Sequence, residues 1–251
     1  MSSRTEERSA ERRVSETVVT ILEALLIALA IRSFLFQPFN IPSASMEPTL
    51  LVGDYLFVSK FSYGYSRYSF PFSPPLFSGR IWAREPDRGD IIVFRHGPDD
   101  FIKRLIGLPG DRIQLKGGVV TINGTPVERR RVADFVGRDP CGFSVPDAPP
   151  VQQWRETLPN GVSYDTLECP RHSEKHDTDV YTVPAGHFFM MGDNRENSED
   201  SRFPDVSYVP FEVLIGRAQI IFFSVSGGAS MWEVWRWPTT LRWNRLFTLL
   251  H

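Results

Sequence analysis

The feature that most constrains the fold of this chain is an apolar span from Val18 to Phe36, close to the N-terminus. It is about the length that a helix needs to cross a hydrocarbon core of ~30 Å. Glu23 and Arg32 interrupt it, but each lies within about two turns of an end, where a charged group can reach the interface. We therefore predict a single transmembrane helix over residues 17–36.

Two alternatives to a membrane anchor are an amphipathic or buried helix of a soluble protein and a cleaved signal peptide. The span is followed by Arg-Ser-Phe-Leu-Phe-Gln-Pro-Phe, which contains no small-x-small cleavage site. This argues against removal of the span as a signal peptide.

The short flanks of the span predict its orientation. Four arginines precede it, whereas beyond Arg32 no lysine or arginine occurs before Lys60. By the positive-inside rule, residues 1–16 are cytoplasmic and the rest of the chain is extracytoplasmic. In a bacterium this corresponds to a single-pass protein of the inner (plasma) membrane with a periplasmic domain.

Composition and pattern predict a mainly β body. Twenty prolines and 18 glycines among 251 residues indicate many turns. Apolar, β-branched or aromatic runs between turn residues predict strands at 50–60, 90–95, 101–106, 119–122, 125–128, 180–183, 187–191 and 217–223. We expect one β domain built from 37–128 and 180–226, with an aromatic, proline-rich loop or ribbon at 62–88.

Two regions stand apart from this domain. Residues 129–179 are polar and proline-rich, and we predict that they form an inserted small subdomain. Its two cysteines, Cys141 and Cys169, are compatible with a disulfide or with free thiols. The tail 227–251 is rich in tryptophan and arginine, which suits contact with lipid headgroups. Packing of the tail on the domain's own sheet is the alternative.

The net charge of −2, with dispersed basic residues, gives no footprint for nucleic acid. His172 and His176, near Cys169, have a spacing that suits metal ligands, but Pro170 and the charged neighbours favour a solvated loop. We predict no metal site.

Residues 41–50 read Ile-Pro-Ser-Ala-Ser-Met-Glu-Pro-Thr-Leu and follow shortly after the span. Pro42 and Pro48 fix φ on both sides, so the backbone of Ser43 and Ser45 is more rigid than that of an ordinary loop. A nucleophile gains from such rigidity, because a small misplacement costs a large factor in rate. The segment indicates a serine nucleophile at the membrane surface, with a stiff juxtamembrane linker as the alternative.

Lys103 lies in a predicted strand, where alternation places it on the same face as Phe101 and Leu105. Burial disfavours the ammonium form and lowers the pKa of a lysine, which turns the side chain into a usable base. Serine is a poor nucleophile until such a base takes its proton. We predict a dyad of Ser45 and Lys103; the alternative is a lysine at a strand edge that pairs in solvent.

The segment Gly192–Arg202 is rich in carboxylates, amides and arginines. A calcium loop of the EF-hand type that begins at Asp193 requires Asp or Asn at its third and fifth positions and Gly at its sixth. Those positions hold Arg195, Asn197 and Ser198. We predict instead a tight loop in which the charges pair with one another.

Together these segments resemble the bacterial type I signal peptidases, membrane-bound serine proteases that remove signal peptides from exported preproteins. The resemblance covers the apolar span, the serine turn, Arg88–Phe94, Phe101–Asp111 and Gly192–Arg202, in the order that the family has them. It does not extend to 129–179 or to the C-terminal tail.

The resemblance implies a role for each matched residue. Ser45 corresponds to the nucleophile and Lys103 to the general base. Ser43 corresponds to the hydroxyl that joins the Ser45 N–H in the oxyanion hole, and Ser198 to the side chain that orients the lysine ammonium. The ion-paired support of the site corresponds to Arg104, Asp193, Asp200 and Arg202, with Arg104 expected to pair with Asp193. The walls of the small substrate pockets correspond to Phe39, Ile41 and Ile102.

The family's activity then implies cleavage after a small-x-small (Ala-x-Ala) site without metal or organic cofactor. The implied partners are preproteins and the lipid bilayer, and we expect a monomer. Three departures from the family pattern are Ala44 for a common glycine, Glu47 for a frequent apolar residue, and Glu196 for an aspartate. None removes a catalytic group.

Three other functions compete with this interpretation. A specialised peptidase for one substrate, such as a conjugative pilus subunit, tends to lack a large insertion like 129–179. A non-catalytic, membrane-anchored periplasmic β scaffold would tolerate conservative changes at Ser45 and Lys103. Self-cleaving repressors share the chemistry but need a DNA-binding helix-turn-helix where this chain has its span.

Overall fold

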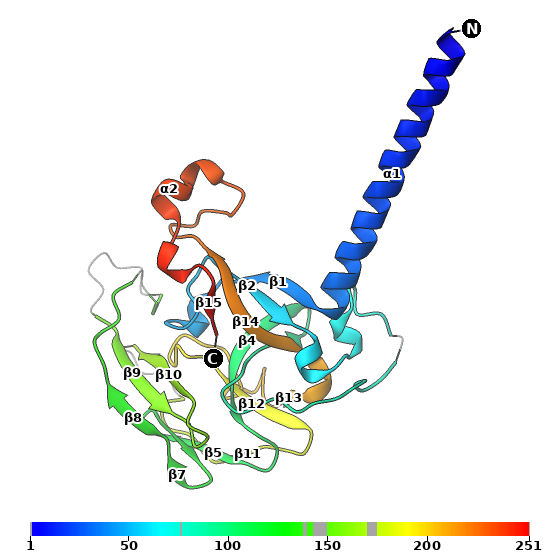
Figure 1. Cartoon of the computed structure of the whole chain (residues 1–251). Coiled ribbons are helices and arrows are strands. Elements are labelled where there is room, and N and C mark those ends of the chain that lie inside the picture. Colours follow the sequence, from blue (N-terminus) through cyan, green and yellow to red (C-terminus); the bar gives the residue numbers. More distant parts are fainter. Residues whose placement is uncertain (1, 76, 138–139, 143–149, 170–174, 251) are drawn as a thin grey trace.

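The protein is described by a computed structural model for residues 2–75, 77–137, 140–142, 150–169 and 175–250. Helix α1 (Ser2–Phe34) projects from a body built of β-strands, as Figure 1 shows. Every pairing between the named strands is antiparallel. The prediction of an N-terminal helix followed by a mainly β domain is confirmed.

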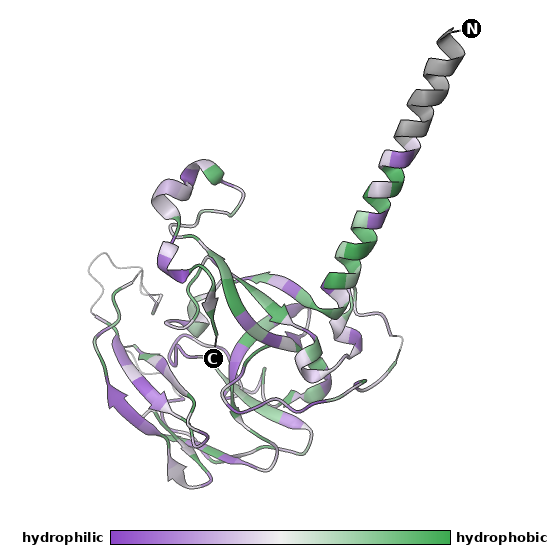
Figure 2. Ribbon diagram, viewed as in Figure 1, coloured by the Kyte–Doolittle hydropathy of each residue, from purple (hydrophilic) through white to green (hydrophobic). Residues whose placement is uncertain are grey.

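The apolar part of α1 is Ser15–Phe34, with a mean hydropathy of 2.0, which is long and apolar enough to cross a membrane. This part of the helix stands clear of the body, so Leu25 and Leu26 are 61% and 65% exposed, and Figure 2 colours most of it as hydrophobic. The helix ends at Phe34, two residues before the predicted end at 36, because the chain from Phe36 onward pairs as a strand.

The largest sheet carries the serine turn and the lysine strand. Its strand order is β1–β2–β14–β3–β4–β12–β13, and β15 also pairs with β14. The strands are β1 (Phe36–Asn40), β2 (Asp54–Ser59), β3 (Ile91–His96), β4 (Asp99–Gly107), β12 (His187–Met191), β13 (Val209–Pro210), β14 (Leu214–Ser224) and β15 (Thr248–Leu249). Pro38 lies in β1, at an edge of the strand order, where a missing N–H is tolerated.

Two smaller sheets complete the body. One has the order β11–β5–β6–β7, formed by Tyr181–Thr182, Arg112–Lys116, Val119–Ile122 and Thr125–Pro126. The other has the order β10–β9–β8, formed by Ser163–Glu168, Gln152–Thr157 and Glu128–Arg131. The predicted insertion 129–179 thus contributes a sheet of its own, whose strands sequence patterning did not single out.

Each predicted strand overlaps an observed one, and the boundaries differ most at 50–60. There the strand begins only at Asp54, because residues 50–53 form a turn that is closed by the Asp54 side chain accepting from Leu51 N at 2.8 Å. The 62–88 region is mostly irregular, as predicted, with two short 3-10 helices, η2 (Phe61–Tyr63) and η3 (Arg67–Ser69).

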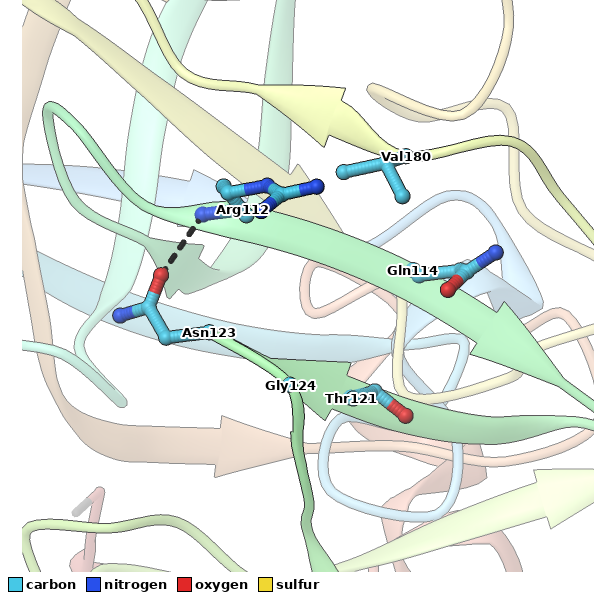
Figure 3. A pocket seen from close by; sticks show the side chains of 6 residues that line it. All are labelled: Arg112, Gln114, Thr121, Asn123, Gly124 and Val180. Atoms are coloured by element: carbon cyan, nitrogen blue, oxygen red, sulfur yellow. Dashed lines mark hydrogen bonds between the residues drawn. The ribbon is translucent and has the colours of Figure 1, made fainter.

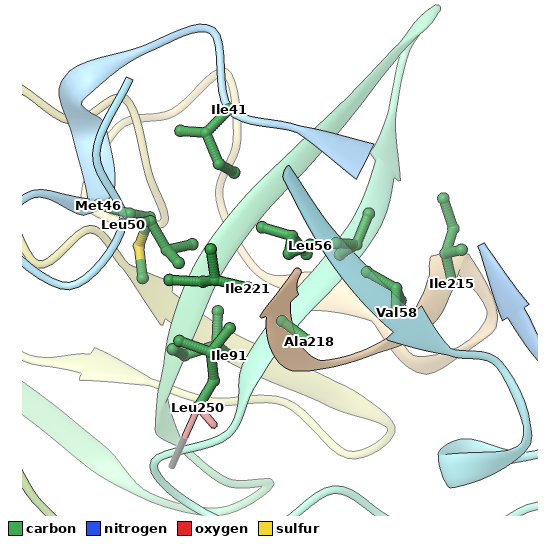
Figure 4. Packing of buried hydrophobic residues seen from close by; sticks show 11 residues of the cluster. Ile41, Met46, Leu50, Leu56, Val58, Ile91, Ile215, Ala218, Ile221 and Leu250 are labelled. Atoms are coloured by element: carbon green, nitrogen blue, oxygen red, sulfur yellow. The ribbon is translucent and has the colours of Figure 1, made fainter. Parts of the chain in front are cut away.

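A hydrophobic cluster joins the serine turn to the main sheet. Met46 and Leu50 pack with Leu56 and Val58 of β2 and with Ile91 of β3, all fully or nearly fully buried. Figure 4 shows these side chains converging between the turn and the strands. The residue that follows Ser45 is therefore held in the core.

The C-terminal region divides into two parts. The segment from Ser226 to Leu241 stands away from the body around η5 (Val234–Arg236) and α2 (Trp237–Thr240) (Figure 1). After it come η6 (Trp243–Arg245) and β15, and Leu250 is buried in the cluster with Met46. The end of the tail thus packs on the domain's own sheet.

The exposed tryptophans of this region are Trp232, Trp235 and Trp243. Contact of these three side chains with lipid stays a prediction.

Candidate active site

Ser45 lies in a short 3-10 helix, η1 (Ala44–Met46), and only 7% of it is exposed. Asn194 holds this turn from outside: its backbone N–H donates to the carbonyl of Ser45 at 3.1 Å, and its side chain donates to the carbonyl of Ala44 at 3.1 Å. The turn is thus fixed by the Gly192–Arg202 loop as well as by its own prolines.

Lys103 lies on β4, 5% exposed, and its Nζ donates to Ser45 Oγ at 2.9 Å. Burial lowers the pKa of Lys103 to about 8, although the carboxylates of Asp200, Glu199 and Asp193 act to raise it. At pH 7 about a tenth of such lysines are neutral. The side chain is therefore placed to accept the proton of Ser45.

Ser43 is exposed, and its Oγ lies 3.4 Å from Ser45 Oγ. A carbonyl group under attack by Ser45 would therefore be within reach of the Ser43 hydroxyl. Ser198 is buried, but the described residues show no hydrogen bond between it and Lys103. The pKa of the nearby Asp200 is lowered, against the effect of burial, chiefly by Arg202. The role of Ser198 in orienting the ammonium of Lys103 stays a prediction.

Two buried ion pairs support the dyad. Arg104, next to Lys103, binds Asp193 through two parallel hydrogen bonds of 2.8 and 2.7 Å, and both side chains are almost fully buried. The pairing arises from the sheet: Met191 of β12 is paired with Arg104 of β4, so the chain just after β12 reaches it. Such charge-assisted, bidentate bonds are strong and directional.

The second ion pair closes the 192–202 loop. Arg202 binds Asp200 through two hydrogen bonds of 2.8 Å, and Asp200 also accepts from the backbone N–H of Gly192 at 2.9 Å. A side chain at Gly192 would clash with Ser198 Oγ at 2.2 Å and with the carbonyl of Ser45 at 2.4 Å. Gly192 therefore allows the loop to lie against the nucleophile turn.

The predicted pocket walls lie together near the turn. Ile41 is buried in the cluster with Met46, and Phe39 of β1 and Ile102 of β4 pack against the same cluster. Two hollows adjoin the turn. One, of about 620 Å³, is lined in part by Ala44 and Glu47, and the other, of about 740 Å³, in part by Pro48.

A third hollow lies elsewhere. Figure 3 shows it on the β5–β6 sheet, lined by Arg112, Gln114, Thr121, Asn123, Gly124 and Val180. It contains none of the predicted site residues.

Sequence reasoning missed a buried network that joins the loop to the inserted sheet. Arg195 contacts both carboxylate oxygens of Glu156 on β9, and Tyr164 of β10 donates to the same carboxylate at 3.1 Å. The guanidinium of Arg104 lies over the Tyr164 ring, 4.1 Å from its centre. Glu156 and Tyr164 lie outside the motifs and carried no sequence signal.

Thr49 was also missed. Its Oγ1 donates to Asp193 Oδ2 at 2.5 Å. The sequence signal that was available for Thr49 is its place inside the segment 41–50, which carries Ser45.

Cys141 and Cys169 form a disulfide, with their Cα atoms 5.9 Å apart. Neighbouring Pro140 accepts from the side chains of Asn194 and Asn197, at 2.7 and 2.8 Å. The disulfide therefore braces the same loop. The sequence left this pairing open.

The described residues contain no group of three or more His, Cys, Asp or Glu side chains that could hold a metal ion. His176 contacts Glu168 and Glu196 at 3.8 and 3.6 Å. His172, the other histidine considered above, lies outside the described residues.

A family model described as signal peptidase, peptidase S26, matches residues 14–223. The chain is 41% identical to Signal peptidase I of Rickettsia conorii over 250 residues, which cover 90% of each protein. It is 43% identical to Signal peptidase I of Rickettsia typhi over 225 residues, 85% of this chain and 81% of that protein. It is 45% identical to Signal peptidase I of Rickettsia prowazekii over 215 residues, 80% and 76% of the two proteins.

Among solved structures, a signal peptidase I from Enterococcus faecalis V583 matches with 23% identity and a TM-score of 0.30. The match covers 53% of this chain and 97% of that one.

Proposed function

Since the chain belongs to the signal peptidase family S26 and is a serine peptidase of the signal peptidase I type, we propose that it cleaves signal peptides from exported preproteins with Ser45 and Lys103. Ser45 is the nucleophile and neutral Lys103 the general base. The observation that carries this proposal is the 2.9 Å contact between Lys103 Nζ and Ser45 Oγ in a buried site.

The reaction begins when the lone pair of neutral Lys103 accepts the Ser45 proton and Ser45 Oγ attacks the carbonyl carbon of the scissile bond. The negative charge that develops on the carbonyl oxygen is stabilised by the Ser45 N–H and the Ser43 hydroxyl. One such donor is worth about 3–4 kcal/mol in the transition state. Lys103 then gives its proton to the leaving amine of the mature protein.

The signal peptide is now the acyl group on Ser45. Lys103, neutral again, takes a proton from a water molecule that attacks the ester, and Ser45 is released. The buried pairs Arg104–Asp193 and Asp200–Arg202 hold β4 and the 192–202 loop in place, and their carboxylates temper the drop in the Lys103 pKa.

We propose that specificity for a small-x-small (Ala-x-Ala) junction comes from shallow pockets walled by Phe39, Ile41 and Ile102. Two of these side chains are partly buried against the core and the third is fully buried, which supports small rather than large side chains in the substrate. All three side chains lie in or against the hydrophobic cluster that contains Met46, the residue after the proposed nucleophile.

We further propose that α1 spans the inner membrane with its N-terminus in the cytoplasm, and that the domain acts in the periplasm as a monomer. The arginines before the span and the absence of basic residues from 33 to 59 support the orientation. A disulfide between Cys141 and Cys169 fits an oxidising compartment. The anchor would hold the site where signal peptide ends leave the bilayer.

Cleavage of a detergent-solubilised preprotein with an Ala-x-Ala junction tests the proposal, with the cut position read by mass spectrometry. We expect the wild type to cut after the second alanine and Ser45→Ala to be inactive yet folded. Ser62→Ala is a matched control, because Ser62 lies outside the site and its hydroxyl is hydrogen-bonded to that of Ser59. An inert wild type, or a fully active Ser45→Ala, would overturn the assignment.

A further inference from the structure

The end of the C-terminal tail binds the turn that follows Ser45. Arg245 contacts both oxygens of the Asp54 carboxylate, at 3.1 and 2.5 Å, and donates to the carbonyl of Thr49 at 2.9 Å. Arg242 donates twice to the carbonyl of Val52, each time at 3.0 Å. Two arginines from the last ten residues thus hold residues 49–54.

Asp54 is the buried residue to which Arg245 binds. It is fully buried, and it also accepts from Leu51 N at 2.8 Å and from Ser224 Oγ at 2.6 Å. A buried carboxylate is costly unless it is paired and hydrogen-bonded. Arg245 therefore supplies the nearer of two countercharges for this side chain, since Arg242 Nη1 lies 3.5 Å from the same carboxylate.

The 49–54 turn also contacts the Arg104–Asp193 ion pair beside Lys103. Thr49 Oγ1 donates to Asp193 Oδ2 at 2.5 Å, and Asp193 binds Arg104, the neighbour of Lys103 on β4. Arg245 holds the carbonyl of Thr49 while Asp193 holds its hydroxyl. An unbroken series of contacts runs from the C-terminal tail to the lysine strand.

The segment before these arginines is built differently. Arg236 lies in the part that extends from the body, and its guanidinium donates to Glu233 at 3.1 Å and to the carbonyl of Gly227 at 3.4 Å, both within that part. Among the described residues, no hydrogen bond or ion pair joins Arg236 to the 49–54 turn, so it serves as the control arginine.

We propose that Arg245 is a positioning residue for the Ser45–Lys103 dyad, acting through Asp54 and the backbone of Thr49. This rests on the proposed function above. The planar guanidinium suits the task because it donates to a carboxylate and a carbonyl at once, whereas a lysine supplies a point charge without that fork. Arg245 lines neither of the two hollows beside the turn, so we expect its loss to affect turnover rather than substrate affinity.

The test is the separate measurement of kcat and KM for the full-length protein in detergent, with the folded fraction taken from circular dichroism. We expect Arg245→Met to lower kcat per folded enzyme about 30-fold with KM within about twofold. Arg245→Lys should fall between Arg245→Met and the wild type. The control Arg236→Met should match the wild type.

Arg245→Met leaves the buried Asp54 carboxylate with the more distant Arg242 as its cation. Asp54→Asn combined with Arg245→Met removes that charge, and it provides a folded protein where Arg245→Met alone does not fold. This double variant should have the same low kcat. A wild-type kcat in the double variant would overturn the proposal, because it would show that Arg245 serves only to neutralise the charge of Asp54.

Thr49→Val separates positioning from general stabilisation. If Arg245 acts through Thr49, the losses in kcat from Thr49→Val and Arg245→Met are not additive, and the pair loses little more than the larger single effect. Additive losses, or an unchanged kcat with a raised KM, would overturn the proposal. An inert wild type would instead overturn the proposed function, so the two failures are distinct.

Discussion

Two regions of the described structure each bury a lysine, and the two lysines differ in the group that each one contacts. Lys103 on β4 is 5% exposed and Lys60, just after β2, is 1% exposed. In both cases burial lowers the pKa to about 8. The two lysines are thus alike in exposure and in pKa.

Their partners differ. Lys103 donates to the hydroxyl of Ser45, in a turn next to two open hollows. Lys60 donates to the backbone carbonyl of Ser69, whose own hydroxyl is fully buried and accepts from Ser66 N. A carbonyl has no proton to give, so Lys60 has nothing to activate. The comparison teaches that a lowered pKa makes a base available, while the neighbouring group decides whether it is used.

The strongest way to break the comparison is to remove each ammonium in turn. We expect Lys103→Met to lower kcat/KM by more than about 10³-fold, because the proton acceptor is lost. Lys60→Met should leave kcat/KM per folded enzyme within about threefold, since its methylene chain can be replaced in the same apolar space. Preprotein cleavage, corrected for the folded fraction, measures both. A comparable catalytic loss in the two variants would mean that Lys60 also acts in turnover.

The pH dependence of cleavage sharpens the same comparison. Below the Lys103 pKa of about 8, the neutral base is lost tenfold per pH unit, so kcat/KM should fall by that factor as the pH is lowered and level off above about 8. Lys60→Met should keep the same acid limb. If the acid limb moves in this variant, the titration that controls cleavage belongs to Lys60 rather than to Lys103.

Glu47 is a buried acid whose pKa shifts in the direction opposite to that of the two lysines. Glu47 follows Met46, is 5% exposed, and burial raises its pKa to about 7. The folded state therefore binds a proton more tightly than the unfolded state does. The resulting penalty to stability is absent below pH about 4.5 and is complete above pH about 7.

Glu47→Gln should remove this penalty and stabilise the protein by about 1–3 kcal/mol at pH 8, with no gain at pH 4. Urea unfolding of the wild type and the variant at both pH values measures the difference. Equal gains at the two pH values would show that packing rather than ionisation is responsible.

The smallest expected effect concerns the exposed Glu199, one of the carboxylates that raise the Lys103 pKa. Glu199→Gln should shift the acid limb of kcat/KM to lower pH by less than about one unit, and less at high salt. The plateau rate above the limb should not change. A shift to higher pH would contradict the sign of this interaction.

Much of the site could be predicted from the sequence because its residues lie in short, contiguous motifs. Residue type and spacing indicate a chemical role for three segments: the serine turn, the lysine strand and the Gly192–Arg202 loop. The structure brings these segments together. What the motifs did not contain was missed: Glu156 and Tyr164 belong to strands of a polar, irregular-looking region. The same holds for Arg245, whose partner Asp54 is 191 residues away in sequence.

The lysines mark the limit of sequence reasoning clearly. Alternation along β4 put Lys103 on an apolar face, whereas Lys60 stood at the end of a predicted strand with no sign that it would be buried. The tertiary structure brings η3 to Lys60, whose ammonium donates to the carbonyl of Ser69.

By itself, the sequence determined the apolar N-terminal helix, the β-rich class and the resemblance to the family, and it predicted the pairing of Ser45 with Lys103, because hydropathy, turn residues and motif spacing are local properties of the chain. Only the tertiary structure decided which residue pairs with each buried charge. It paired Cys141 with Cys169, placed Arg195 on Glu156 and brought the C-terminal arginines onto the turn after Ser45. Such pairings depend on how distant strands pack, and a buried charge must take whatever partner that packing provides.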